Sequence, residues 1–173
     1  MFKVPQALIQ IIRPIKFQLE MTMPTFERMW DEKEQRVSSA EIESMISAAI
    51  SEIYRKRKIH PYALQVILAG FGEALANASE HGNLSNTSKK IIIRCWFCEK
   101  GIIFSFCDEG NFFKQLKNKK AVESRTTLPS TREDPSGAGM DLIYLADKVF
   151  VSMRENTLYL AYTDTLDKIA EEK

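Results

Sequence analysis

The sequence predicts one α/β domain, an α+β two-layer sandwich in which a mixed, largely antiparallel sheet carries helices on one face. Apolar residues recur at helical spacing in two segments, around residues 42–53 and 61–82. Several short segments rich in β-branched and aromatic residues neighbour one another along the chain, which favours a mixed or antiparallel sheet. With 173 residues, the chain is long enough for one substantial core and rather short for two.

Composition and charge exclude several classes of protein. The hydrophobic share of 45% and the charged share of 27% are ordinary for a globular protein, and a net charge of +1 argues against a general nucleic-acid or membrane-surface binder. Pro5, Arg13 and Pro14 interrupt the apolar N-terminal stretch well before the roughly 20 residues that a membrane span needs. Without a signal-peptide pattern, and with an odd number of cysteines, we expect a cytoplasmic protein.

The first predicted elements are a strand and two helices. Apolar residues alternate with polar ones from Ile15 to Met21, as in a half-buried strand. Ser38 and Glu41 form a capping box before an amphipathic helix. A second helix is expected to begin at Pro61, where the missing N–H costs nothing, and to stop at Gly82.

The remaining elements are mostly strands. Residues 90–98 and 102–107 are expected to form a hairpin around residues 99–101. Residues 108–136 are too long and polar for a simple connection, so they form a candidate functional loop. A helix over about 138–147 and a hairpin pairing 148–154 with 157–163 complete the prediction.

Cys95 and Cys98 have the Cys-x-x-Cys spacing that can bind a metal or support redox chemistry. They lie in a predicted strand, however, where side chains three residues apart point to opposite faces. We therefore expect cysteines that pack within the strand.

Glu73 and Asn77 are the first candidate functional residues. They are four residues apart on a predicted helix and therefore project from the same face. An amide oxygen of this kind suits Mg²⁺, and a carboxylate one turn away can accept a proton from a hydroxyl or a water. The alternative for this pair is an exposed helical face with both side chains in solvent.

Two glycine-containing stretches are further candidates. Asp108 directly follows an apolar strand, Gly110 permits a tight turn, and the exocyclic amine of a nucleobase would offset the cost of burying the carboxylate. A simple Asp-x-Gly turn remains the alternative. Gly137 and Gly139 precede an apolar helix, where backbone N–H groups can approach an anion such as phosphate.

The segments "EALANASEHG", "DEGNFF" and "SGAGMDLIYLADKV" occur in this order. Together they resemble the nucleotide-binding boxes of the GHKL ATPase superfamily, and specifically its bacterial anti-sigma-factor serine/threonine-protein kinase branch. The resemblance covers nearly the whole chain. It implies a single histidine-kinase-like domain over residues 1–173 with the Bergerat-type ATP-binding fold.

The resemblance also implies roles for individual residues. Glu73 would be the general base, Asn77 the Mg²⁺ ligand, and Asp108 the carboxylate that recognises adenine beside the turn at Gly110. Thr157 would be a second adenine contact, with a simple β-forming role as the alternative. The loop that binds the phosphates of ATP or ADP would consist of Ser136, Gly137, Ala138, Gly139 and Met140.

Residues 111–136 correspond to the ATP lid in this resemblance. The chain departs from the family pattern at two positions, with Phe112 in place of a second glycine and Pro135 in place of an arginine. A run of lysines, Lys114 to Lys120, makes the lid basic, and a solvated charge run is the alternative to a phosphate-binding or acidic-partner surface. Arg125 or Arg132 is the candidate to reach the γ-phosphate.

The resemblance implies an ATP-dependent serine/threonine kinase of the anti-sigma type that uses Mg²⁺. Its expected partners are a STAS-type anti-sigma factor antagonist, which it phosphorylates, a sigma factor, which it sequesters, and a second copy of itself in a homodimer. No direct contact with nucleic acid or membrane is expected. The alternatives are a non-catalytic, nucleotide-gated binding module and a partner-switching kinase without a sigma-factor target.

Overall fold

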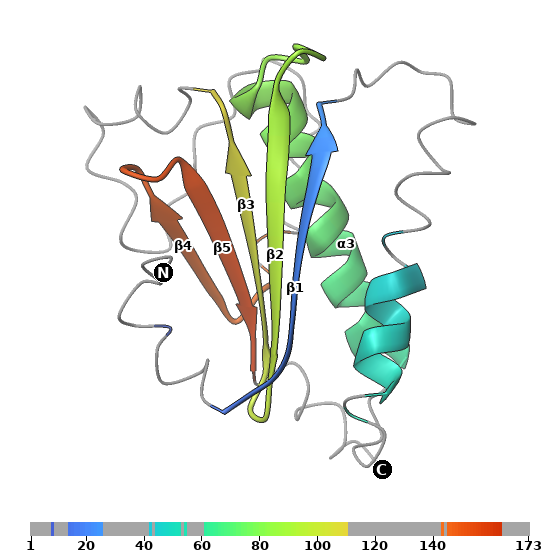
Figure 1. Ribbon diagram of the computed structural model, residues 1–173. Helices are drawn as coiled ribbons and strands as arrows, with labels where there is room; N and C mark the ends of the chain where they lie inside the picture. Colours follow the sequence, from blue (N-terminus) through green and yellow to red (C-terminus); the bar gives the residue numbers. More distant parts are fainter. Residues whose placement is uncertain are drawn as a thin grey trace.

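The computed structural model describes residues 8, 14–25, 42, 44–52, 54, 61–110, 143 and 145–163. Its sheet has five strands in the order β1-β2-β3-β5-β4, and all neighbouring pairs are antiparallel. Figure 1 shows α3 lying against one face of this sheet beside the helical residues 44–52. The predicted α+β fold with helices on one face is therefore confirmed. The strands are β1 (Ile15–Pro24), β2 (Lys90–Cys98), β3 (Ile102–Asp108), β4 (Lys148–Ser152) and β5 (Thr157–Tyr162).

The two predicted hairpins are both present. β2 and β3 pair from Ile91 opposite Asp108 to Phe97 opposite Ile102, and β4 pairs with β5. The buried Tyr54 fixes the β2–β3 turn, because its hydroxyl lies 2.6 Å from the carbonyl oxygen of Cys98 and 2.7 Å from that of Gly101. The hairpin end is thereby tied to the helical layer.

The first strand follows its predicted alternation only in its second half. Leu19, Met21 and Met23 pack against the core between the helices and the sheet. Ile15 and Phe17 are exposed to 42% and 45%. β1 is an edge strand, so fewer neighbours cover its beginning.

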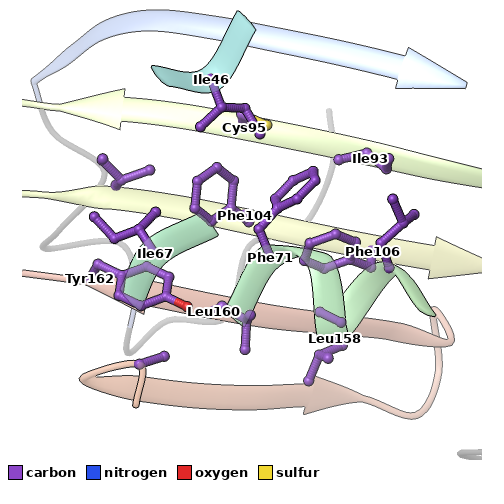
Figure 2. Packing of buried hydrophobic residues seen from close by; sticks show 14 of the residues in the cluster. Ile46, Ile67, Phe71, Ile93, Cys95, Phe104, Phe106, Leu158, Leu160 and Tyr162 are labelled. Atoms are coloured by element: carbon purple, nitrogen blue, oxygen red, sulfur yellow. The ribbon is translucent and has the colours of Figure 1, made fainter. Parts of the chain in front are cut away.

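The core between helices and sheet is built around Phe71 of α3. Its ring lies 5.1 Å from that of Phe104 and 5.0 Å from that of Phe106, measured between centroids. Figure 2 shows this ring between the two β3 phenylalanines, with Ile67 one turn earlier on α3. Burying large aromatic side chains contributes most to such a core, so α3 is firmly seated against β3.

The two cysteines of β2 point to opposite faces, as predicted. Cys95 belongs to the core under the helices, whereas Cys98 packs on the other face with Trp96 and Ile103. Burial raises the pKa of the Cys95 thiol to about 12 and that of Cys98 to about 11. In the part of the chain that the structure describes, no group of histidine, cysteine or acidic residues is arranged to hold a metal ion.

The second helix begins at Pro61 and reaches Gly82, as predicted, but its last turn is not α-helical. α3 (Pro61–Asn77) continues directly into a π-helical turn, η1 (Ala78–Gly82). The N–H of Asn83 closes this turn by donating to the carbonyl of Ala78 at 2.9 Å. Among the described residues, no helix is long and apolar enough to cross a membrane.

The helix predicted over residues 138–147 lies largely outside the described residues. Within them, Ile143 is helical, but residues 145–147 form a turn and a bend. The carboxylate of Asp147 accepts the backbone N–H of Thr163 at 2.6 Å and so belongs to the approach to β4. The predicted end of this helix at 147 was therefore too late.

Candidate functional site

Glu73 and Asn77 lie one turn apart near the end of α3, as their spacing predicts. Asn77 Nδ2 lies 3.4 Å from Glu73 Oε1, and both residues are half-buried. Because the amide nitrogen faces the carboxylate, the carbonyl oxygen of Asn77 points away from it. The helix thus presents a carboxylate and, one turn later, an amide oxygen that is directed away from it; these groups suit a proton acceptor and an Mg²⁺ ligand, respectively.

Asp108 ends β3 and points toward the helical layer. It shares the strand face of Phe104 and Phe106, which pack against α3. The residue is only 5% exposed. Its Oδ1 accepts the N–H of Gly110 at 2.8 Å and a hydrogen bond from Asn156 Nδ2, which also donates to the backbone oxygen of Asp108 at 2.9 Å.

These contacts leave Oδ2 of Asp108 without a hydrogen bond to any described residue. Burial raises the pKa of the carboxyl, and the Gly110 N–H, the Asn156 amide and the positive charge of Lys89 partly offset this rise. A buried carboxylate with one oxygen that no described residue contacts by a hydrogen bond can accept from an external donor, and the exocyclic amine of a nucleobase is such a donor.

Two glycines let η1 and the turn after β3 approach this carboxylate. A Cβ on Gly82 would lie 2.4 Å from Asp108 Cγ, and a Cβ on Gly110 would lie 1.5 Å from the carbonyl oxygen of Gly82. Neither glycine has a positive φ. Gly82 is therefore required by close approach to Asp108 and not by the left-handed helix cap that usually explains a glycine stop.

This close approach brings the two predicted pairs to one end of the molecule. η1 directly follows Asn77 and ends at Gly82, which contacts Asp108. Figure 1 shows the end of the helix beside the edge where β3 ends and β2 begins. Glu73, Asn77, Asp108 and Gly110 thus lie toward the same end of the molecule, with η1 linking the first pair to the second, and this set is called the cluster.

Thr157 does not take part in this cluster. It pairs with Cys107 at the start of β5, and the next residue, Leu158, faces the helical core. Side chains alternate along a strand, so Thr157 points to the opposite face from Asp108, and its hydroxyl donates to the carbonyl of Glu155 at 2.9 Å. The predicted contact of Thr157 with adenine is therefore not supported by its position.

Asn156 is the site residue that the sequence did not suggest. It is 5% exposed, has a positive φ of 49°, and contacts Asp108 twice. Its Oδ1 is buried and has no hydrogen-bond partner among the described residues. The available signal was an asparagine in a hairpin turn, since asparagine tolerates positive φ better than most residues, but this signal gives no reason to expect contact with Asp108.

The rest of the predicted site lies outside the described residues. This includes the ATP lid over 111–136 with Phe112 and Pro135, and the predicted phosphate loop. The loop residues are Ser136, Gly137, Ala138, Gly139 and Met140.

A comparison with protein-family models identifies the family to which this chain belongs. The model of the histidine kinase-like ATPase domain matches residues 38–162, which is most of the chain. The chain belongs to this family. A comparison with curated proteins finds no matching sequence.

Membership in the histidine kinase-like ATPase family identifies a GHKL-type, ATP-binding domain of the kinase or ATPase kind. The matched range contains α3, η1 and all strands except β1. The described cluster fits such a nucleotide, because it combines a buried acceptor at Asp108 with oxygen donors at Glu73 and Asn77.

Proposed function

We propose that this protein is an ATP-dependent serine/threonine protein kinase of the anti-sigma-factor type, acting in the cytoplasm. Glu73 and Asn77 carry the proposal, because α3 holds a carboxylate and an amide within 3.4 Å of each other. η1 then leads from this pair directly to the buried acceptor Asp108. One element thus connects a candidate base and metal ligand with a candidate nucleobase contact.

In the proposed reaction, ATP is the substrate that supplies the γ-phosphoryl group, and Mg²⁺ supplies neutralisation of phosphate charge. Asn77 would hold the metal through its amide oxygen. Glu73 would accept the proton of a serine or threonine hydroxyl on the target protein as that oxygen becomes bonded to phosphorus and ADP leaves. Asp108 would accept a hydrogen bond from the exocyclic amine of adenine, which guanine cannot donate from the same position.

The proposed target is a STAS-type anti-sigma factor antagonist, and the proposed second partner is a sigma factor that the kinase sequesters. The sequence segments that resemble the anti-sigma kinases support these partners. A homodimer completes the proposal. Its support is the resemblance together with β1, an edge strand that exposes Ile15 and Phe17.

The test replaces Glu73, the candidate general base, by a residue of the same shape that cannot accept the proton. Glu73→Gln should retain Mg-ATP binding, while phosphate transfer to a cognate antagonist falls by about 10²- to 10⁴-fold. Glu52→Gln, a change at an exposed helical glutamate, is the matched control and should transfer phosphate like the parent. Calorimetry with Mg-ATP and transfer of labelled phosphate measure the two effects.

Two results would contradict the kinase proposal. If Glu73→Gln transferred phosphate as fast as the parent, Glu73 would not be the general base. A parent protein that binds a sigma factor only with ATP, and transfers phosphate to no cognate antagonist, would be a nucleotide-gated binding module instead.

A further inference from the structure

Asn83 directly follows η1 and is completely buried, although its side chain is a polar amide. Its exposed fraction is 0%. Its Nδ2 donates to Thr25 Oγ1 at 2.7 Å and to the carbonyl of Lys90 at 3.0 Å, while its Oδ1 accepts the N–H of Glu109 at 2.8 Å. The side chain therefore joins the end of β1, the start of β2 and the turn after β3.

The orientation of this amide is fixed by its neighbours. The backbone N–H of Glu109 can only donate, and the carbonyl of Lys90 can only accept. Turning the amide over would place like groups against each other at both contacts. Asn83 thus holds the backbone at Glu109 in one position relative to β2.

Glu109 lies between the two residues that shape the candidate base contact. Asp108 precedes it, and Gly110, whose N–H donates to Asp108 Oδ1, follows it. The Glu109 carboxylate also accepts the N–H of Lys90 at 2.7 Å, but that side chain is exposed. The Asn83 contact is a part-buried bond from a fully buried side chain, and it holds this turn from the helix side.

We propose that Asn83 is a positioning residue for nucleotide recognition, acting through the Glu109 backbone on the carboxylate of Asp108. The inference rests on the proposed binding of an adenine nucleotide at Asp108. Without Asn83, the Glu109 N–H loses its acceptor, and the turn that orients the Asp108 carboxylate is free to shift. Small displacements of a binding group are costly, because the hydrogen bond depends on both distance and angle.

Thr25 provides a matched control for a purely structural role. Its hydroxyl accepts from Asn83 Nδ2 and donates to the carbonyl of Lys89 at 3.0 Å, whereas Glu109 donates to the other end of the amide, Oδ1. Thr25→Val keeps the branched shape but removes both bonds. This variant therefore weakens the same buried network without touching the turn that carries Asp108.

The experiment compares Mg-ADP binding by calorimetry with the midpoint of thermal unfolding for the parent, Asn83→Ala and Thr25→Val, all measured well below their Tm. Both variants should unfold several degrees below the parent. Asn83→Ala should weaken Mg-ADP binding roughly tenfold, the order of effect of an unsatisfied buried donor. Thr25→Val should bind within about twofold of the parent, because Asn83 Oδ1 is still present to accept the Glu109 N–H.

Equal affinities of Asn83→Ala and Thr25→Val would overturn the positioning role while leaving nucleotide binding intact. A parent that binds no adenine nucleotide would overturn the proposed function itself, and the inference with it.

A second measurement uses the unmodified protein and does not depend on the folding of a variant. In NMR spectra, saturating Mg-ADP should shift the side-chain amide resonances of Asn83 and leave those of the exposed Asn86 unchanged. Unshifted Asn83 resonances would also overturn the inference.

Discussion

Replacement of Asp108 by asparagine tests the recognition of the base with little change in shape. Asp108→Asn keeps an oxygen that can accept from Gly110 and Asn156, the two donors to Oδ1 in the parent. In place of Oδ2, however, the variant presents an NH₂ group, which can only donate. The exocyclic amine of adenine then meets another donor.

The expected loss follows from the type of bond removed. A hydrogen bond to a charged group contributes about 1.5–3 kcal/mol, so the affinity for ATP and ADP should fall by roughly 10- to 150-fold. GTP should bind the parent poorly and should not lose affinity to the same extent. Calorimetry with the three nucleotides measures these differences.

Asp108→Asn should lower nucleotide affinity without lowering the stability of the folded protein. The pKa of Asp108 is raised by burial, so the folded protein binds its proton more tightly than the unfolded chain does. The stability that protonation contributes is present below the ordinary Asp pKa and is lost as pH rises through the raised folded-state pKa. Above that folded-state pKa the parent carries the cost of a buried charge, and there Asp108→Asn should unfold at the same or a higher temperature.

The raised pKa also predicts how nucleotide binding depends on pH. A protonated Asp108 offers a poorer acceptor, so the parent should lose ATP affinity on acidification at a higher pH than an ordinary aspartate would. Glu109→Gln is the matched control, since it removes the neighbouring exposed charge and should bind normally. Parent-like ATP binding by Asp108→Asn would refute the assignment of this carboxylate to adenine.

Three other variants test the surroundings of Asp108. Gly82→Ala forces a Cβ to within 2.4 Å of Asp108 Cγ, and it should cost about 1–3 kcal/mol in thermal unfolding and weaken nucleotide binding. Asn156→Gly accepts the φ of 49° without strain but removes both hydrogen bonds that Asn156 Nδ2 donates to Asp108, so titrations should show ATP affinity reduced several-fold. Thr157→Val should leave affinity unchanged, and a loss equal to that of Asn156→Gly would place Thr157 back in the site.

The sequence predicted the strands and the helix start because these depend on local patterns. The β2–β3 hairpin follows from two β-rich runs around a short turn, and Pro61 marks a helix start by its own covalent structure. The pair Glu73 and Asn77 was equally accessible, since a spacing of four needs only the α-helical period. Each of these predictions requires no knowledge of which segments meet in space.

The missed features depend on contacts between distant segments. Asn156 lies 48 positions from Asp108 in the chain, and no local pattern connects them. Thr157 was chosen from its resemblance to a family strand, but a shift of one residue along a strand moves a side chain to the other face. Thr157 pairs with Cys107 in the sheet, whereas Asn156 lies in the turn before β5, and this difference is a property of the folded sheet.

The π-helical turn explains why Gly82 and Asn83 meet the strand ends at all. In a continued α-helix the N–H of Asn83 would donate to Ser79, but here it donates to Ala78, so the turn contains one extra residue. One residue of an α-helix corresponds to a rotation of about 100°. The extra residue rotates the end of the helix relative to the face that carries Glu73, and it lets Gly82 contact Asp108 while Asn83 reaches Glu109. The α-helical period read from the sequence therefore places Glu73 and Asn77 correctly on one face of α3. It misplaces the residues of η1, where the helix meets Asp108, the candidate contact for the nucleobase.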